Sequence, residues 1–443
     1  MRVAKHGATV LAIAALAVLV AAPSAGATQA GKREPRRINP LIFVHGGSGS
    51  AAQFESQQMR FTSNGFPQRY IYILEYNTAT PITENIDEVH AALDRLIQRV
   101  KAKTGKARVD VLGHSRGTTV MHGYLATAAR AANVRRYVNI DGRTATTPPG
   151  GVQTLALWAG RGQPGRSIGG AKNVTVPNQT HVQAATSAES FAHMFRFLTG
   201  RKARTTKIKK GNRTVKVAGR AVSFPQNVGM ADTKLQVWRI TDSSGRRIGG
   251  RPIARPALAS NGSWGPIKLR RGQRYEFALV RVGGATHHIY TEPFRRNDLL
   301  VRLLSAPPGG GIEALLADRP ANAAGLVVTR YKEIWGDQGA ASDILKINGR
   351  NVINAATSPI DNRTNAVFVF DKGSDGISNL TAPLSPFFGI SFLTGVDLYM
   401  PASSPPDGRV TVKLRSRGKG PFRSLNIPNW PSATNLVSVH FND

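Results

Sequence analysis

The segment Val109–Thr119, with the sequence VDVLGHSRGTT, constrains the fold of this chain more than any other. An apolar run leads into Gly113–Gly117, and a helix-forming run over Met121–Arg130 follows. This order predicts a strand, a sharp turn with a serine at its apex, and a helix. Glycines flank such a turn because side chains there would strike the neighbouring strand and helix. The pattern therefore predicts an exposed nucleophile at Ser115, and a purely structural turn is the alternative interpretation.

Strand-like runs alternate with amphipathic helical runs from about Ile38 to Gly200. The expected strands are Leu41–Val44, Tyr70–Leu74, the run that begins at Val109, Arg136–Ile140, Thr154–Ala159 and Asn173–Val176. One expected helix covers Glu84–Lys103, and a last one places Phe191, Met194, Phe195 and Leu198 on one face. This alternation predicts an α/β fold with a parallel sheet that is covered on both faces.

The pattern changes after Gly200 to short strand-like runs that are separated by Gly, Pro, Asn and Ser, and Pro307–Gly311 interrupts the chain. Two successive β-sandwich-like domains fit this pattern. We therefore expect a signal peptide over residues 1–27, an α/β domain over 33–200, and β-sandwich-like domains over 201–306 and 312–443.

The N-terminus has the pattern of an export signal. Arg2 and Lys5 precede an apolar run over Ala8–Ala22, and Ala25–Ala27 offers a small-x-small cleavage site. The apolar run is short for a membrane span, and no second run of this kind follows. The sequence therefore predicts a secreted, extracellular protein with no transmembrane segment. Its lack of cysteines excludes disulfides, thiolate metal sites and a cysteine nucleophile.

The chain is strongly basic, with 59 Lys and Arg against 26 Asp and Glu and a formal net charge of +33. Nucleic acid is one partner that such a charge suggests, but the sequence contains no recognisable nucleic-acid-binding fold. An anionic interface such as membrane lipid, cell-wall polymer or fatty-acid-coated droplets fits an exported protein better. The alternative is that the charge only keeps the protein soluble. Within Arg201–Lys216, eight basic residues and no acid indicate a solvated linker or edge strand, with a polyanion site as the alternative.

A serine nucleophile needs a histidine base and an acid, which follow it in the order Ser, acid, His in this kind of fold. Downstream of Ser115, the α/β region contains His122, His181 and His193. His122 lies just after the turn, and His193 falls within the last amphipathic helix. His181 follows the last strand, at the carboxyl end of the sheet where catalytic residues gather, and is therefore the expected base.

The acid is found by elimination, because no Asp or Glu lies between Asp141 and Glu189. Asp141 ends a strand, and Gly142 permits a sharp turn after it. Asp110 precedes the serine inside its own strand, and Glu189 follows the histidine, so both are poor substitutes. We expect Asp141 to be the acid, and a turn-forming Asp-Gly pair is the alternative.

Attack on an ester builds an oxyanion that backbone N–H groups must stabilise. The expected oxyanion hole takes one N–H from Arg116, directly after the nucleophile, and one from Gly47 in the glycine-rich loop Phe43–Ser50. Glycine-rich loops also hold phosphates, but neither G-K-[ST] nor G-x-G-x-x-G accompanies this one.

These motifs carry a family resemblance. Ile42–Ser50, Gly113–Gly117, the early Asp141 and the loop Asn178–His181 resemble a secreted α/β-hydrolase lipase of small core, similar to class 2 triacylglycerol lipases and esterases. Further on, Asn261–Pro266 and Glu292–Asp298 look like the C-terminal β-domain that a subset of these lipases carries. The resemblance implies that the β-part helps to meet lipid or to shape the substrate entrance.

The sequence as a whole predicts a secreted serine carboxylester hydrolase, a lipase, with the triad Ser115, Asp141 and His181 and an acyl-enzyme intermediate. No metal or organic cofactor is implied, no nucleic acid is expected, and the expected partner is a lipid or another acyl ester. We expect the β-rich part to act on surfaces and not in the chemistry. The alternatives are an extracellular polyester depolymerase and a non-catalytic surface-binding protein on a hydrolase scaffold.

Overall fold

The computed structural model describes residues 38–230, 232–316 and 318–442. The signal peptide expected over residues 1–27 lies outside the described residues. So do the first residues of the α/β domain expected from residue 33.

Six strands form one parallel sheet in the order β2-β1-β3-β4-β5-β6. Their bounds are β1 Leu41–Val44, β2 Ile71–Leu74, β3 Val109–His114, β4 Val134–Ile140, β5 Gln153–Ala159 and β6 Lys172–Val176. All four residues of β1 are buried, as expected for a central strand that is covered on both faces. The parallel order confirms the expected α/β fold.

Helices cover both faces of this sheet. Their bounds are α1 Glu55–Ser63, α2 Ile82–Thr104, α3 Arg116–Leu125, α4 Ala128–Ala131, α5 Gln183–Thr186 and α6 Ala188–Thr199. Phe61 of α1 and Phe191 of α6 pack with Phe43 in one apolar cluster. Ile42, the neighbour of Phe43, points to the other face and packs in a cluster with residues of α2 and α3. Short 3-10 helices lie at Ala51–Phe54, Gln68–Tyr70 and Pro149–Gly151.

Strands dominate the chain after residue 213. The first group comprises β7 Thr214–Ser223, β8 Val228–Gly229, β9 Thr233–Arg239, β10 Ser263–Arg270, β11 Tyr275–Arg281, β12 Thr286–Thr291 and β13 Asp298–Ser305. The second comprises β14 Leu326–Arg330, β15 Ile344–Ile347, β16 Arg350–Asn351, β17 Ala366–Phe370, β18 Leu393–Asp397, β19 Arg409–Arg415, β20 Arg423–Pro428 and β21 Asn435–Phe441. Further 3-10 helices lie at Gly311–Leu315, Gly339–Ala341, Ile360–Asn362, Lys372–Ser374, Ser385–Phe387 and Ser416–Gly418.

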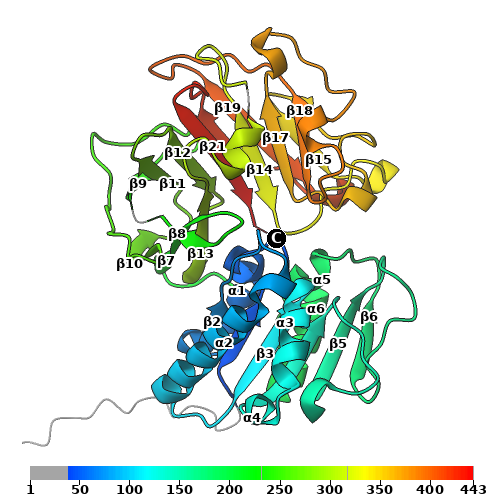
Figure 1. The fold of residues 1–443 in the computed structure, drawn as a ribbon. Helices are drawn as coiled ribbons and strands as arrows, with labels where there is room; N and C mark the ends of the chain where they lie inside the picture. Colours follow the sequence, from blue (N-terminus) through cyan, green and yellow to red (C-terminus); the bar gives the residue numbers. More distant parts are fainter. Residues whose placement is uncertain (1–37, 231, 317, 443) are drawn as a thin grey trace, which may run out of the picture. The chain divides into compact units, whose positions relative to one another are not determined.

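The two groups share one seven-stranded sheet in the order β18-β17-β14-β21-β12-β11-β9. In Figure 1 the red strand β21, near the end of the chain, runs between β12 and the yellow β14. A four-stranded sheet built on β7 packs against one half of this large sheet, and the sheet β16-β15-β19-β20 packs against the other. Two sandwich-like packings of sheet on sheet are therefore present, as expected. The large sheet is common to both of them.

Buried polar contacts join the β-rich part to the α/β part. Glu75, which follows β2, pairs with Arg220 of β7 at 2.9 Å and with Arg302 of β13 at 2.7 Å. Gln58 of α1 donates to the Asp298 carboxylate at 2.8 Å. These groups satisfy one another's hydrogen bonds. Separating the β-rich part from the α/β part would therefore break these pairs.

Candidate active site

Ser115 lies at the tip of the sharp turn between β3 and α3. Its backbone has φ 53° and ψ −124°, a conformation that a serine rarely adopts. Two positions of this turn have room only for glycine. A Cβ on Gly117 would lie 2.4 Å from the Val44 carbonyl oxygen, and a Cβ on Gly113 would lie 2.8 Å from the Gly117 carbonyl oxygen. The strain and the crowding together fix the serine at the carboxyl end of the sheet.

His181 lies in the loop after β6, and its Nδ1 is 2.6 Å from Oδ2 of Asp141. Asp141 follows β4 with φ 42°, and its other oxygen accepts hydrogen bonds from the Ala159 N–H at 3.0 Å and from Arg166 at 2.9 Å. Burial raises the pKa of this carboxyl, but the hydrogen bond from His181, the Ala159 N–H and the Arg166 charge together lower it to about 2. Asp141 is therefore ionised at neutral pH and aligned with the imidazole.

The other two carboxylates that the sequence offers have different partners. Glu189 accepts a hydrogen bond from Gln179 at 3.0 Å, and Asp110 pairs with Arg135 through two hydrogen bonds. Neither carboxylate has a hydrogen bond to His181 in the described part of the chain.

Ser115 and His181 line the same cavity, which has a volume of about 360 Å³. No hydrogen bond joins Ser115 Oγ to His181 within residues 38–230. Catalytic hydrogen bonds of this kind are often long before a substrate binds.

The glycine-rich loop lines the cavity beside the serine, with Gly46, Gly47, Ser48 and Gly49 in its wall. The Gly47 N–H has no hydrogen-bond partner among the described residues. Arg116 is the first residue of α3, where a backbone N–H has no intrahelical acceptor. Two free donors are thus available next to Ser115.

A buried imidazole, that of His45, holds this loop. His45 stacks on Tyr76 with ring centroids 4.4 Å apart, and its Nδ1 lies 3.0 Å from the Gly46 carbonyl oxygen. The Tyr76 N–H points at His45 Nε2 at 3.4 Å, which assigns the proton to Nδ1. Burial lowers the pKa of His45 to about 4, so the ring is neutral and donates to Gly46. The sequence motif did not reveal this supporting role.

The Arg116 side chain turns away from the serine. Its guanidinium donates to the Thr78 carbonyl at 3.1 Å and also to the Thr80 carbonyl. These contacts fix the start of α3 against the loop that follows β2.

Much of the remaining wall of the cavity comes from the β-rich part. Its apolar members are Phe224, Pro225, Leu304, Leu315, Val327, Ala366, Ile390, Phe392 and Leu393. These residues are separated by up to about 170 positions in the chain, and no local motif marks them. Only the packing of the β-sheets onto the α/β part brings them to the serine.

The described residues contain no helix long and apolar enough to span a membrane. Within those residues no cluster of three or more His, Asp and Glu side chains is placed to hold a metal ion.

Comparisons with known proteins identify three segments. Residues 38–134 match the family model of class 2 lipases, residues 213–308 match that of the lipase C-terminal domain, and residues 311–443 match that of a further C-terminal domain. The first and second matches bring the hydrolase fold and the lipase type of β-domain together in one chain.

Two solved structures illustrate the likeness. The Bacillus licheniformis lipase BlEst2 in its propeptide form shares 10% identity over 89% of this chain and 94% of its own, with a TM-score of 0.30. A CIB-like hydrolase from Thermoplasma acidophilum shares 14% identity over 38% of this chain and 89% of its own, with a TM-score of 0.29. At these TM-scores the structural likeness adds no weight to the matches with the sequence families.

Proposed function

Because the chain joins a class 2 lipase segment to a lipase C-terminal domain, we propose that it is a serine carboxylester hydrolase acting as a lipase. One observation carries the proposal. The strained Ser115 shares a cavity with His181, and His181 is hydrogen-bonded to the ionised Asp141 at 2.6 Å. A serine, a base and an orienting acid in this arrangement are what acyl transfer requires.

In the proposed reaction, His181 removes the proton from Ser115 Oγ as this oxygen attacks the ester carbonyl. The N–H groups of Gly47 and Arg116 hold the negative oxygen of the tetrahedral intermediate. The intermediate collapses to the acyl-serine, and His181 returns its proton to the leaving alcohol. Water, activated by the same base, then releases the carboxylic acid and restores the serine.

Asp141 serves this cycle by holding the Nδ1–H of His181, so that the other ring nitrogen is free to accept the serine proton. Its negative charge stabilises the imidazolium that forms in the transition state. Arg166 and the Ala159 N–H keep the carboxylate in place on its far side.

The apolar wall from the β-rich part supports an acyl chain as the bound group, because a cavity whose exposed lining is mainly apolar suits a fatty acyl ester. The sequence-based expectation was that the β-rich part acts on surfaces and not in the chemistry, and the family resemblance implied that it meets lipid or shapes the substrate entrance. We propose that it also shapes the acyl site.

We propose further that the protein is exported and adsorbs to anionic ester surfaces, on the strength of its export-type N-terminus and its net charge of +33. Attraction between a basic protein and such a surface weakens as salt screens the charges.

The test is a chain-length series of p-nitrophenyl esters, followed by emulsified triglyceride at low and high salt and by polyester film. Wild type should cleave the esters and the emulsion, with less adsorption at high salt. Ser115→Ala should lose about 10³-fold or more of this activity with an unchanged circular dichroism spectrum, because it removes only a hydroxyl. Activity on polyester film alone would favour the depolymerase alternative, and no ester cleavage would exclude the proposed function.

A further inference from the structure

The loop that carries His181 depends on a carboxylate from a distant part of the chain. Glu333 accepts hydrogen bonds from the Val182 N–H at 2.6 Å and from the Gln183 N–H at 3.0 Å. It also accepts one from the hydroxyl of Thr180. The residues on both sides of His181 are therefore tied to one side chain that lies about 150 positions further along the sequence.

Only an acceptor suits this position. Three donors converge on the two oxygens of Glu333, whose side chain is fully buried. A carboxylate has about four acceptor sites and no hydrogen to turn against a donor, whereas an amide would point its NH₂ at one of the three. Without Glu333, two backbone N–H groups beside His181 would lose their acceptor in a buried place.

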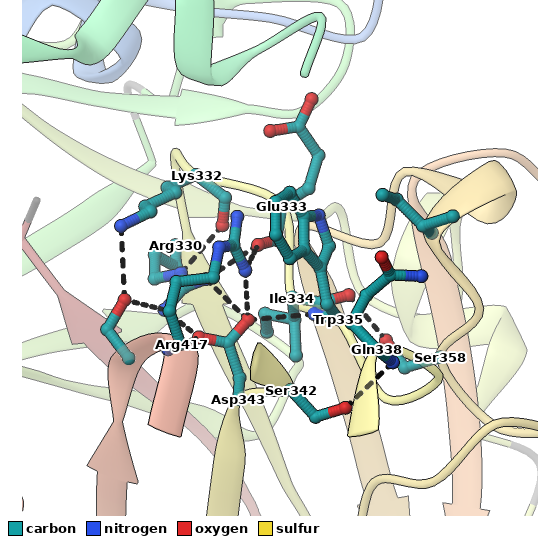
Figure 2. A network of polar contacts seen from close by, with 12 residues as sticks. Arg330, Lys332, Glu333, Ile334, Trp335, Gln338, Ser342, Asp343, Ser358 and Arg417 are labelled. Carbon is teal, nitrogen blue, oxygen red and sulfur yellow. Dashed lines mark hydrogen bonds and ion pairs between the residues drawn. The ribbon is translucent and has the colours of Figure 1, made fainter. Parts of the chain in front are cut away.

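Glu333 is itself held rigidly. Its backbone carbonyl accepts from Arg330 at 2.6 Å and from Arg417 at 2.8 Å. Both guanidiniums pair with Asp343, and the Arg330–Asp343 pair is completely buried. In Figure 2 the Glu333 side chain extends away from this cluster, while its backbone belongs to it. The cluster therefore fixes the backbone of Glu333, and the side-chain carboxylate of this residue reaches into the α/β part.

The opposite side of the loop is held from within the α/β part. His114, next to the nucleophile, donates from Nε2 to the His181 carbonyl at 2.9 Å, and its Nδ1 accepts from Gln53 at 2.6 Å. Burial lowers the pKa of His114 to about 3, so its ring is neutral in this role. The hydrogen bond from His114 thus positions His181 relative to Ser115. The hydrogen bonds to Glu333 hold the same loop from the β-rich part.

We propose that Glu333 is a positioning residue for the catalytic base, so that the active site is complete only when the segment from Arg330 to Asp343 is docked. The proposal rests on the proposed function of His181. Its geometric basis is that displacing a catalytic group by about 1 Å can cost on the order of 10²-fold in rate.

The test compares Glu333→Gln with Asp298→Asn in the full-length protein. Asp298 is a matched control because it is also a buried carboxylate that accepts from an α/β side chain and a backbone N–H, but it does not touch the His181 loop. For a short soluble ester well below the melting temperature, Glu333→Gln should lower kcat about 10- to 100-fold and leave KM within about threefold. Asp298→Asn should keep kcat within about twofold of wild type, whatever it does to the melting temperature.

A folded Glu333→Gln protein with wild-type kcat would overturn the proposal, and so would an equal loss of kcat in Asp298→Asn. If Glu333→Gln does not fold, Thr180→Val removes one of the three hydrogen bonds and keeps the side-chain volume. It should lower kcat severalfold at constant KM, and an unchanged kcat would contradict the positioning role. An inactive wild type would instead refute the proposed function.

Discussion

The two sides of the cavity at Ser115 differ in chemistry and in origin. The α/β side brings the serine, the imidazoles and the glycine loop, all from one edge of a parallel sheet. The β-rich side brings mainly apolar surface from strands and loops that are far apart in the sequence. The difference suggests that the first side determines the rate of the chemical step and the second the fit of the substrate. Glu333 departs from this division, because it belongs to the β-rich part but holds the loop that carries His181.

Of the variants that distinguish the α/β side of the cavity from the β-rich side, Asp141→Asn is expected to have the largest effect on the kinetics. The amide cannot hold the correct tautomer of His181 or stabilise the imidazolium, so kcat should fall by about 10²- to 10⁴-fold with little change in KM. Steady-state kinetics on a soluble ester measures both constants.

Glu189→Gln is the control for this change, because Glu189 contacts Gln179 and not His181. It should leave kcat within about threefold of wild type. A large loss in Glu189→Gln together with a small one in Asp141→Asn would mean that the wrong carboxylate has been assigned.

A smaller effect, on KM and not on kcat, is expected for a change on the β-rich side. Ile390→Ala removes apolar surface from the cavity wall and should raise KM for long acyl chains about five- to tenfold, as the loss of about 1–1.5 kcal/mol of contact implies. Acetate esters have a two-carbon acyl group with little apolar surface to bury, so they should be hydrolysed as by wild type.

Ile377→Ala serves as the matched control, because Ile377 is 64% exposed and does not line the cavity. It should not change the chain-length profile. If Ile390→Ala lowers kcat equally for all chain lengths, the division between a chemical side and a binding side is wrong.

The α/β fold was predictable because its signals are local. The structure contains the apolar strand Leu41–Val44 where it was expected. The amphipathic helix that begins at Ile82 also lies close to its expected bounds. His181 was proposed from chain order and Asp141 by elimination of the other carboxylates, and the structure brings the two side chains together. Their catalytic roles stay predictions until the variants are measured.

Helix α1 was not predicted, for a physical reason. Its residues Glu55–Gln58 are polar yet buried, since the helix lies between the parallel sheet and the β-rich part. A helix that is covered on more than one side lacks the single apolar stripe by which sequence analysis finds amphipathic helices.

The shared seven-stranded sheet and the role proposed for Glu333 also escaped prediction. The pairing of β12 with β21 joins residues about 150 positions apart, and the contact of Glu333 with Val182 spans a similar distance. Neither follows a periodicity or a motif, so only the folded chain reveals them. The expected domain boundaries at 201–306 and 312–443 stay predictions, since a common sheet crosses between them.

The central claim, that Ser115 is an activated nucleophile, is tested most directly by covalent labelling. A fluorophosphonate that mimics an ester should add one group per chain, and peptide mass spectrometry should find it on Ser115. Ser115→Ala should remain unlabelled under the same conditions, and Asp141→Asn should label far more slowly than wild type. A label on another residue, or an active wild type that does not react, would contradict the account.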